Sequence, residues 1–195
     1  MIKSEDYKIF KENLSTLKEL SKDTSEKNNI SYMTQSELKA IDFDTVKTQY
    51  ANKLHLSEET ASSLDAILLI HEHEVFIEFK NGNIKNEKRK IKDKIRDSLL
   101  IYCDITDKHI SYTRANIVFI LVYNEKKNPI PHNLKLENSV RQNAREKIAE
   151  HIIKKANEEL IRFDLEKFKT LYFKEVHTYT ENEFEEYLKN ISSNL

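Results

Sequence analysis

Residues 64–80 constrain the fold of this chain more than any other part of its sequence. They contain two apolar stretches, 64–70 and 75–80, that are rich in aliphatic, β-branched and aromatic residues and are separated by a polar tetrapeptide. This pattern predicts a β-hairpin. If Ile70 pairs with Val75, then Asp65 lies opposite Lys80, and strand alternation sends two chemically different sets of side chains to the two faces.

One face of the predicted hairpin is entirely apolar, and it is formed by Ala66, Leu68, Ile70, Val75, Ile77 and Phe79. The other face carries three charged residues at one end: Asp65, Glu78 and Lys80. Burying two carboxylates and an ammonium in a strand pair is unfavourable without further partners. A divalent cation would relieve that cost, and carboxylates at an open, oxygen-rich site suit Mg²⁺, with Mn²⁺ as the alternative ion.

Glycine occurs once in 195 residues, which excludes several nucleotide-binding folds. A Walker A loop, a dinucleotide-binding turn and a kinase phosphate loop each need two or three glycines within a few residues. The single Gly82 follows the second predicted strand within Asn81-Gly82-Asn83. We expect it either to supply a positive φ or a close backbone approach, or simply to end the strand in a turn.

The overall composition is that of one globular domain with little net charge. The chain has 32 Lys and Arg against 33 Asp and Glu, and 38% of its residues are hydrophobic. A single Cys103 permits no internal disulfide and suggests a reducing compartment. Residues 1–10 hold no apolar signal-like stretch, so we expect a soluble, cytoplasmic protein without membrane attachment.

Apolar periodicity and capping patterns predict the remaining elements. Helices are expected over 1–22, after a capping box at Thr34–Glu37, from near Asp44, over 85–102 with Ile91, Ile95, Leu99 and Tyr102 on one stripe, over 138–160, and after Thr180 with Glu183 three residues on. Strands are expected over 117–123 and 171–179, and polar segments over 22–30 and around Pro129 and Pro131. The predicted fold class is therefore α/β, a three-layer-like sandwich of a small mixed β-sheet flanked by helices.

The spacing of the charged residues resembles the signature of the PD-(D/E)XK nuclease-like superfamily. Asp65 is followed after twelve residues by Glu78-Phe79-Lys80, although Leu64 stands where the motif has proline. The resemblance implies a restriction-endonuclease-like core at about 44–123 in a single domain over 1–195, with a helical extension over 1–43 and a helix–strand–helix over 138–195. It implies that Asp65 and Glu78 bind Mg²⁺ or Mn²⁺ and that Lys80 is the catalytic lysine.

The same resemblance implies two further contributors without identifying them. The helix after the E-x-K motif often supplies a basic or amide side chain, for which Lys90, Lys94 and Arg96 are candidates. An acid from the preceding helix would be Glu37, Glu58 or Glu59. A cluster of such charges in a chain that is 33% charged also fits a solvated strand edge or a structural ion-pair network.

A basic run over residues 85–96 is the second functional feature of the sequence. It has a net charge of +5, with two acids among seven basic residues: Lys85, Lys88, Arg89, Lys90, Lys92, Lys94 and Arg96. Such a run attracts phosphate backbones through counterion release, and it is equally typical of the solvated face of an amphipathic helix.

Two functions follow from these patterns. The first is a metal-dependent nuclease in which Mg²⁺-activated water hydrolyses a phosphodiester, with DNA favoured over RNA as substrate. The second is a catalytically idle nuclease-like fold that binds a protein such as a toxin, as a bacterial immunity or phage-defence accessory protein would. Near-neutral charge and small size favour the second function.

Overall fold

The computed structural model describes residues 7–24, 30–70, 73–129 and 160–193, and these form an α/β fold around a mixed six-stranded sheet. The strand order is β1–β4–β5–β6–β7–β8. These strands are β1 (Leu14–Thr16), β4 (Lys39–Asp42), β5 (Ala66–Ile70), β6 (His73–Lys80), β7 (Ile117–Tyr123) and β8 (Glu175–Thr180). Neighbours are antiparallel from β1 to β6 and parallel from β6 to β8.

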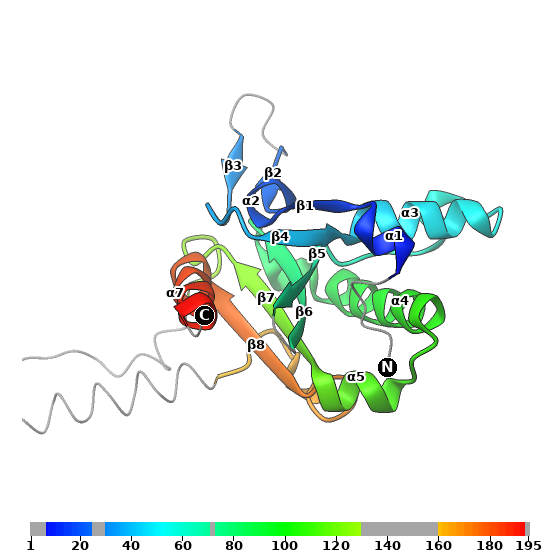
Figure 1. Ribbon diagram of the computed structural model, residues 1–195. Coiled ribbons are helices and arrows are strands. Elements are labelled where there is room, and N and C mark those ends of the chain that lie inside the picture. The colour runs from blue at the N-terminus through cyan, green and yellow to red at the C-terminus, as the bar shows by residue number, and fades with distance from the viewer. Residues whose placement is uncertain (1–6, 25–29, 71–72, 130–159, 194–195) are drawn as a thin grey trace, which may run out of the picture.

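Helices cover both faces of this sheet, in agreement with the predicted layered arrangement (Figure 1). One face packs against α1 (Lys8–Lys11), α3 (Phe43–Lys53) and α4 (Lys88–Thr106), with α5 (Ile110–Asn116) leading into β7. The opposite face packs against α2 (Leu17–Leu20) and α7 (Glu181–Ser193). A separate two-stranded ribbon joins β2 (Lys22–Asp23) to β3 (Ser31–Tyr32), and the described residues include short 3₁₀ turns at Glu58–Thr60, Ile84–Asn86 and Glu166–Phe168.

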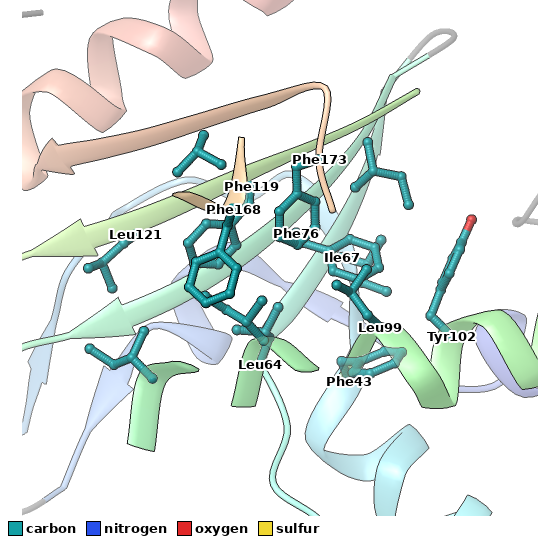
Figure 2. Close-up of a cluster of buried hydrophobic side chains, with 14 of the residues drawn as sticks. Phe43, Leu64, Ile67, Phe76, Leu99, Tyr102, Phe119, Leu121, Phe168 and Phe173 are labelled. Carbon is teal, nitrogen blue, oxygen red and sulfur yellow. The ribbon is translucent and has the colours of Figure 1, made fainter. Parts of the chain in front are cut away.

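Aromatic residues fill the larger of the two cores, between the sheet and α4 (Figure 2). Phe76 of β6 contacts Tyr102 and Phe173 in edge-on geometry, with ring centroids 5.1 and 6.0 Å apart. The predicted α4 stripe of Ile91, Ile95, Leu99 and Tyr102 is buried here, as expected from its helical spacing.

The β5–β6 hairpin confirms the predicted facing of its side chains but corrects the register. The apolar set packs in the core beside α7, while Ile67 and Phe76 face α4. However, Ile70 pairs with His73 rather than Val75. The strands therefore slide by two residues, which preserves the face of every side chain because the strand period is two.

The observed register brings Glu74 into the strand, where it pairs with Leu69. The sequence places Glu74 in a polar loop, whereas it is the second residue of β6 and is only 9% exposed. Its carboxylate accepts hydrogen bonds from Tyr102 and Lys108, the latter at 3.1 Å, so its charge is compensated inside the protein. The strand can therefore extend two residues further than its polarity suggests.

The expectation of one helix over residues 1–22 is wrong in the described part of that range. Two four-residue helices, α1 and α2, flank the short strand β1, which pairs with β4. Asn13 Nδ2 donates to the Ile9 carbonyl at 2.7 Å, and the Thr16 hydroxyl accepts from the Glu19 amide at 3.2 Å. Such side-chain bonds compete with helix continuation and break the segment into pieces.

The capping box predicted at Thr34–Glu37 is also wrong, because no helix begins there. The Thr34 hydroxyl instead donates to Glu185 of α7 at 2.6 Å, and the chain enters β4. The second predicted box is confirmed, since the Thr180 amide donates to Glu183 at 2.7 Å and the Glu183 amide donates back to Thr180 at 3.3 Å.

The other predicted elements stand as follows. The helix expected near Asp44 is α3, capped by Asp42, whose carboxylate accepts from the Thr45 amide at 3.0 Å. The helix expected over 85–102 is preceded by a 3₁₀ turn and continues to residue 106, and the strand expected over 171–179 is β8.

The helix expected over 138–160 lies outside the described residues except at its last position, and β2 occupies part of the segment expected to be polar loop. Strands β1, β4 and β8 belong to the same sheet as the expected 44–123 core.

Gly82 does not supply a positive φ, and a Cβ at that position would meet nothing within 4 Å. It therefore serves as a strand-ending turn residue. The described left-handed positions are taken by other residue types: His55, Asp107, Phe163, Asp164 and Thr170, with φ between 52° and 70°.

Among the described helices, none is both long and apolar enough to cross a membrane.

Candidate functional site

Two carboxylates meet where the start of β5 lies beside the end of β6, in the middle of the sheet. Asp65 directly precedes β5 and Glu78 lies near the end of β6, and the observed register sets these two positions across from each other. Glu78 is fully buried. The Phe79 amide donates to Asp65 Oδ2 at 2.6 Å, which fixes the orientation of that carboxylate. Their convergence thus follows from the hairpin itself.

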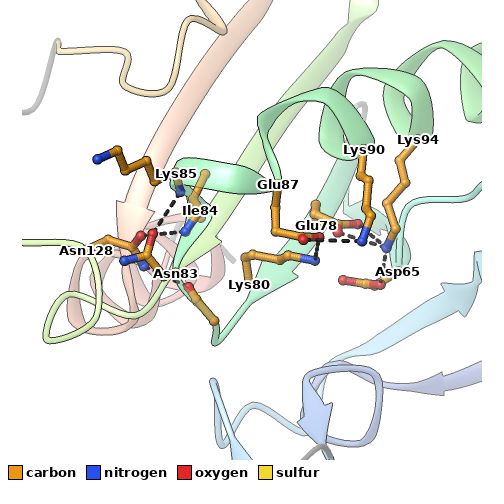
Figure 3. Close-up of polar contacts among 11 residues, drawn as sticks. Asp65, Glu78, Lys80, Asn83, Ile84, Lys85, Glu87, Lys90, Lys94 and Asn128 are labelled. Atoms are coloured by element: carbon orange, nitrogen blue, oxygen red, sulfur yellow. Dashed lines mark hydrogen bonds and ion pairs between the residues drawn. The ribbon is translucent and has the colours of Figure 1, made fainter.

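Lys94 of α4 bridges both carboxylates (Figure 3). Its Nζ lies 2.8 and 3.0 Å from the two oxygens of Glu78 and 3.4 Å from Asp65 Oδ1. The Lys94 side chain is 25% exposed, so it reaches the pair from the rim of the site. Of the three α4 side chains that the sequence proposed for this position, the structure places Lys94 on the carboxylates.

The site sets two carboxyl groups against the single ammonium of Lys94. Burial raises the pKa of Asp65, and burial together with the charge of Asp65 raises the pKa of Glu78 well above its usual range. Burial alone would lower the pKa of Lys94, but the charges of Asp65 and Glu78 outweigh it and raise that pKa. Lys94 therefore stays protonated while its two partners resist ionisation.

Lys80 lies beside the carboxylates but pairs with another acid. Its Nζ lies 3.6 Å from Glu87, just before α4, and its positive charge acts to lower the pKa of Glu78. Glu87 also accepts from Lys90, at 3.2 Å. Lys80 remains 23% exposed, so its ammonium stands at the mouth of the site, next to the carboxylates but not in contact with them.

An acid near the site that was not among the predicted candidates is Asp44. It lies in the first turn of α3, accepts a hydrogen bond from Ser63, and its charge acts on both Asp65 and Lys94. The three predicted acids lie elsewhere: Glu37 is paired at 3.8 Å with Lys18, and Glu58 and Glu59 form an exposed 3₁₀ turn. The available signal was the position of Asp44 at the start of the helix between β4 and β5.

A groove of about 430 Å³ reaches Asp65 and Lys80 from solvent, whereas Lys94 and the fully buried Glu78 do not line it. Asp65, Lys80 and Glu87 line it on one side, and Lys22 and Asp23 of the β2–β3 ribbon line it on the other. The ribbon is fastened to the end of β6, because the Asn81 side chain donates to Asp23 at 2.7 Å and to Ser31 at 3.1 Å.

Most of the predicted basic run is neutralised by acidic side chains. Six of its seven members contact an acid: Lys88 and Lys92 contact Asp164, Lys90 contacts Glu87, Arg89 and Arg96 contact Asp93, and Lys94 contacts Asp65 and Glu78. Lys85 is exposed and, with Lys88, Lys127 and Arg162, lines a second cavity of about 570 Å³. The positive charge is therefore weaker than the sequence suggests and is concentrated at the start of α4.

The chemistry of the donors fits a hard divalent cation. Asp65 and Glu78 supply carboxylate oxygens that converge on one cationic group, and the groove reaches Asp65. Within the described ranges, no group of three or more His, Cys, Asp and Glu side chains is arranged to hold a metal ion. A cation here would be held by two carboxylates, of which Asp65 lines the groove and Glu78 is buried.

Comparison of this chain with protein-family models, with curated proteins and with solved structures found no match.

Proposed function

We propose that this protein is a metal-dependent phosphodiesterase that cleaves nucleic acid, with a site of the PD-(D/E)XK type. The observation that supports the proposal best is the convergence of Asp65 and Glu78 on the single ammonium of Lys94, a position that a cation of higher charge would also favour. Lys80 stands at the mouth of the same site.

The topology around the site supports this assignment. Strands β4, β5 and β6 form an antiparallel meander, and α4 then leads to β7, which runs parallel to β6. This order is consistent with a restriction-endonuclease-like core, with α3 inserted between the first two strands. Asp65 directly precedes the second strand of the meander, and Glu78 and Lys80 lie at the end of the third.

Each residue has a defined task in the proposed reaction. Bound Mg²⁺ or Mn²⁺ would lower the pKa of a water molecule and neutralise phosphate charge. Asp65 and Glu78 would hold the ion, and the Phe79 amide keeps Asp65 oriented toward it. The Lys80 ammonium, once released from Glu87, would stabilise the negative charge that develops on the phosphate.

Cleavage assays with a matched pair of lysine variants test this function. Purified protein is incubated with labelled single-stranded DNA, duplex DNA and RNA, in Mg²⁺, Mn²⁺ or EDTA. We expect cleavage only with a metal, favouring DNA over RNA, and a fall of about 10²–10³-fold in Lys80→Ala because a positive charge near the transition state is lost.

Lys90→Ala is the control, because Lys90 also pairs with Glu87 but is 74% exposed and does not line the groove. It should keep nearly full activity, and both variants should retain the circular dichroism spectrum of the parent. If the parent protein cleaves none of the substrates with either metal, the proposal is wrong.

A second candidate function is a protein-binding module with an idle site. The contact of Lys80 with Glu87 and the neutralised basic run favour it, because both reduce the positive charge available to a phosphate backbone. A stable complex with a protein toxin, unchanged by Asp65→Ala, would support this function over the first.

A further inference from the structure

We propose that Lys94 is a built-in counter-ion that occupies the cation position between Asp65 and Glu78 and competes with a divalent metal for it. The inference rests on the proposed function, since it takes these two carboxylates to be metal ligands. It adds a regulatory property, because metal binding must displace an ammonium that belongs to the protein.

The contacts of Lys94 account for the oxygens that a metal would need. Both oxygens of Glu78 face its Nζ, and so does Asp65 Oδ1. The remaining oxygen, Asp65 Oδ2, accepts from the Phe79 amide. An ion that binds both carboxylates would therefore take the place of the three contacts made by Lys94.

The placement of Lys94 allows such displacement. It reaches the site from α4 through a flexible four-carbon stem, and its side chain is 25% exposed toward the rim. The charge of Asp44 also acts on Lys94, so a displaced ammonium keeps an anion nearby. Displacement therefore moves one side chain and leaves the strands that carry the carboxylates in place.

Lys94 differs from other basic residues of α4 in how deeply its acidic partner is buried. Lys88, Lys90 and Arg96 pair with acids that are at least 28% exposed, where water screens the interaction. Lys94 pairs with a carboxylate that has no exposure at all. Its charge therefore acts on the metal position with little screening.

Direct metal titration tests the competition without reference to catalysis. Mn²⁺ binding to the full chain is measured by calorimetry and by the loss of the free-ion paramagnetic resonance signal. For Lys94→Met we expect a dissociation constant at least about tenfold lower than for the parent, because a positive charge next to the ion has been removed. Lys94→Gln is measured in parallel, since it keeps a polar group and fills the site if the methionine variant does not fold.

Two controls define the outcome. Lys90→Met, one turn earlier on α4, should leave Mn²⁺ affinity unchanged, and adding Asp65→Asn to Lys94→Met should abolish the gain. If the parent binds Mn²⁺ and the Lys94 variants bind it equally or more weakly, the competition is refuted while the proposed function stands. If neither the parent nor the variants bind Mn²⁺, the metal-dependent function fails and the inference fails with it.

Discussion

Strand β6 carries two buried carboxylates with opposite electrostatic situations. Glu74 accepts hydrogen bonds from Tyr102, Tyr112 and Lys108, so its negative charge has a dedicated cation and two hydroxyl donors. Glu78 shares the single ammonium of Lys94 with Asp65. Both are acidic residues in an apolar strand, yet only the second shares its ammonium with another carboxyl group.

Replacing each carboxylate by an amide should therefore affect the free energy of unfolding differently at the two positions. Glu74→Gln removes the charge that compensates Lys108, which is only 9% exposed, and should lower the free energy of unfolding by about 3 kcal/mol. Glu78→Gln relieves repulsion with Asp65 and should leave the free energy of unfolding unchanged or raise it while abolishing metal binding. Urea denaturation without metal measures both variants.

The pH dependence of the free energy of unfolding gives a second test of the environment of Glu78. Because the pKa of Glu78 is raised above its ordinary value of 4.5, the folded protein retains a proton that the unfolded chain releases. The contribution of Glu78 to stability therefore falls as pH rises from about 4.5 toward its folded-state pKa. Glu78→Gln should flatten this decline, and a steeper decline in the variant would contradict the assignment.

At the scale of elements, the chain places its one glycine where no left-handed backbone is needed. Leu54 is the C-cap of α3 and His55 follows it with φ 58°, while Asp107 is the C-cap of α4 with φ 52°. Glycine is the residue that adopts such angles most easily. Gly82, in contrast, adopts no positive φ and leaves open space around its Cβ position.

Removing the glycine at position 82 and placing one at the left-handed position 55 should each stabilise the protein. Gly82→Ala should raise the free energy of unfolding by about 0.5 kcal/mol, because it restricts the unfolded chain and meets no atom in the folded one. His55→Gly should raise it by up to about 1 kcal/mol by relieving the left-handed angle, whereas His55→Ala should not. Thermal unfolding compares the three variants. A lower melting temperature for Gly82→Ala would show that position 82 does require glycine.

The elements that the sequence predicts well are those whose apolar pattern is sustained. The run 117–123 and the α4 stripe are long, and the hairpin faces follow from alternation alone. The N-terminal segment was mispredicted because pairing of β1 with β4 is decided by a strand far along the chain. A periodic pattern over a short segment cannot report such a distant partner.

The candidate site also contains residues that the sequence predicts and residues whose placement depends on tertiary packing. Asp65 and Glu78 could be brought together from the sequence, because both belong to one hairpin and side-chain facing survives a two-residue slip. Asp44 could not be selected, because its role depends on how α3 packs after β4. Lys94 could be proposed only as one of three basic residues, since the rotation of α4 against the sheet depends on its packing.

At the scale of the whole molecule, the sheet separates two cores that meet at β6. Phe79 packs against Phe184 of α7 on one face, with ring centroids 5.7 Å apart, while its amide holds Asp65 at the site. The core beside α7 therefore supports the backbone that positions a carboxylate on the opposite side of the sheet.

Phe184→Ala should act on both properties. It should lower the free energy of unfolding by about 3–4 kcal/mol, because Phe184 is fully buried, and should weaken Mn²⁺ binding by loosening Phe79. Leu171→Ala, at a side chain that is 48% exposed, should change stability by less than about 0.5 kcal/mol. Urea denaturation and metal titration report the two effects separately, and undiminished Mn²⁺ affinity in a destabilised Phe184→Ala would break the link between the cores.

The loops that follow β6 and β7 also suggest how such a protein can diversify over evolutionary time. The turn after β6 and the loop after β7 leave the sheet at the same end, and Asn124 joins them by donating to Asn81 at 2.8 Å. Both loops lie outside the strands that hold Asp65 and Glu78. Lineages could therefore exchange loop sequences, and with them the shape of the groove, while inheriting the charged centre unchanged.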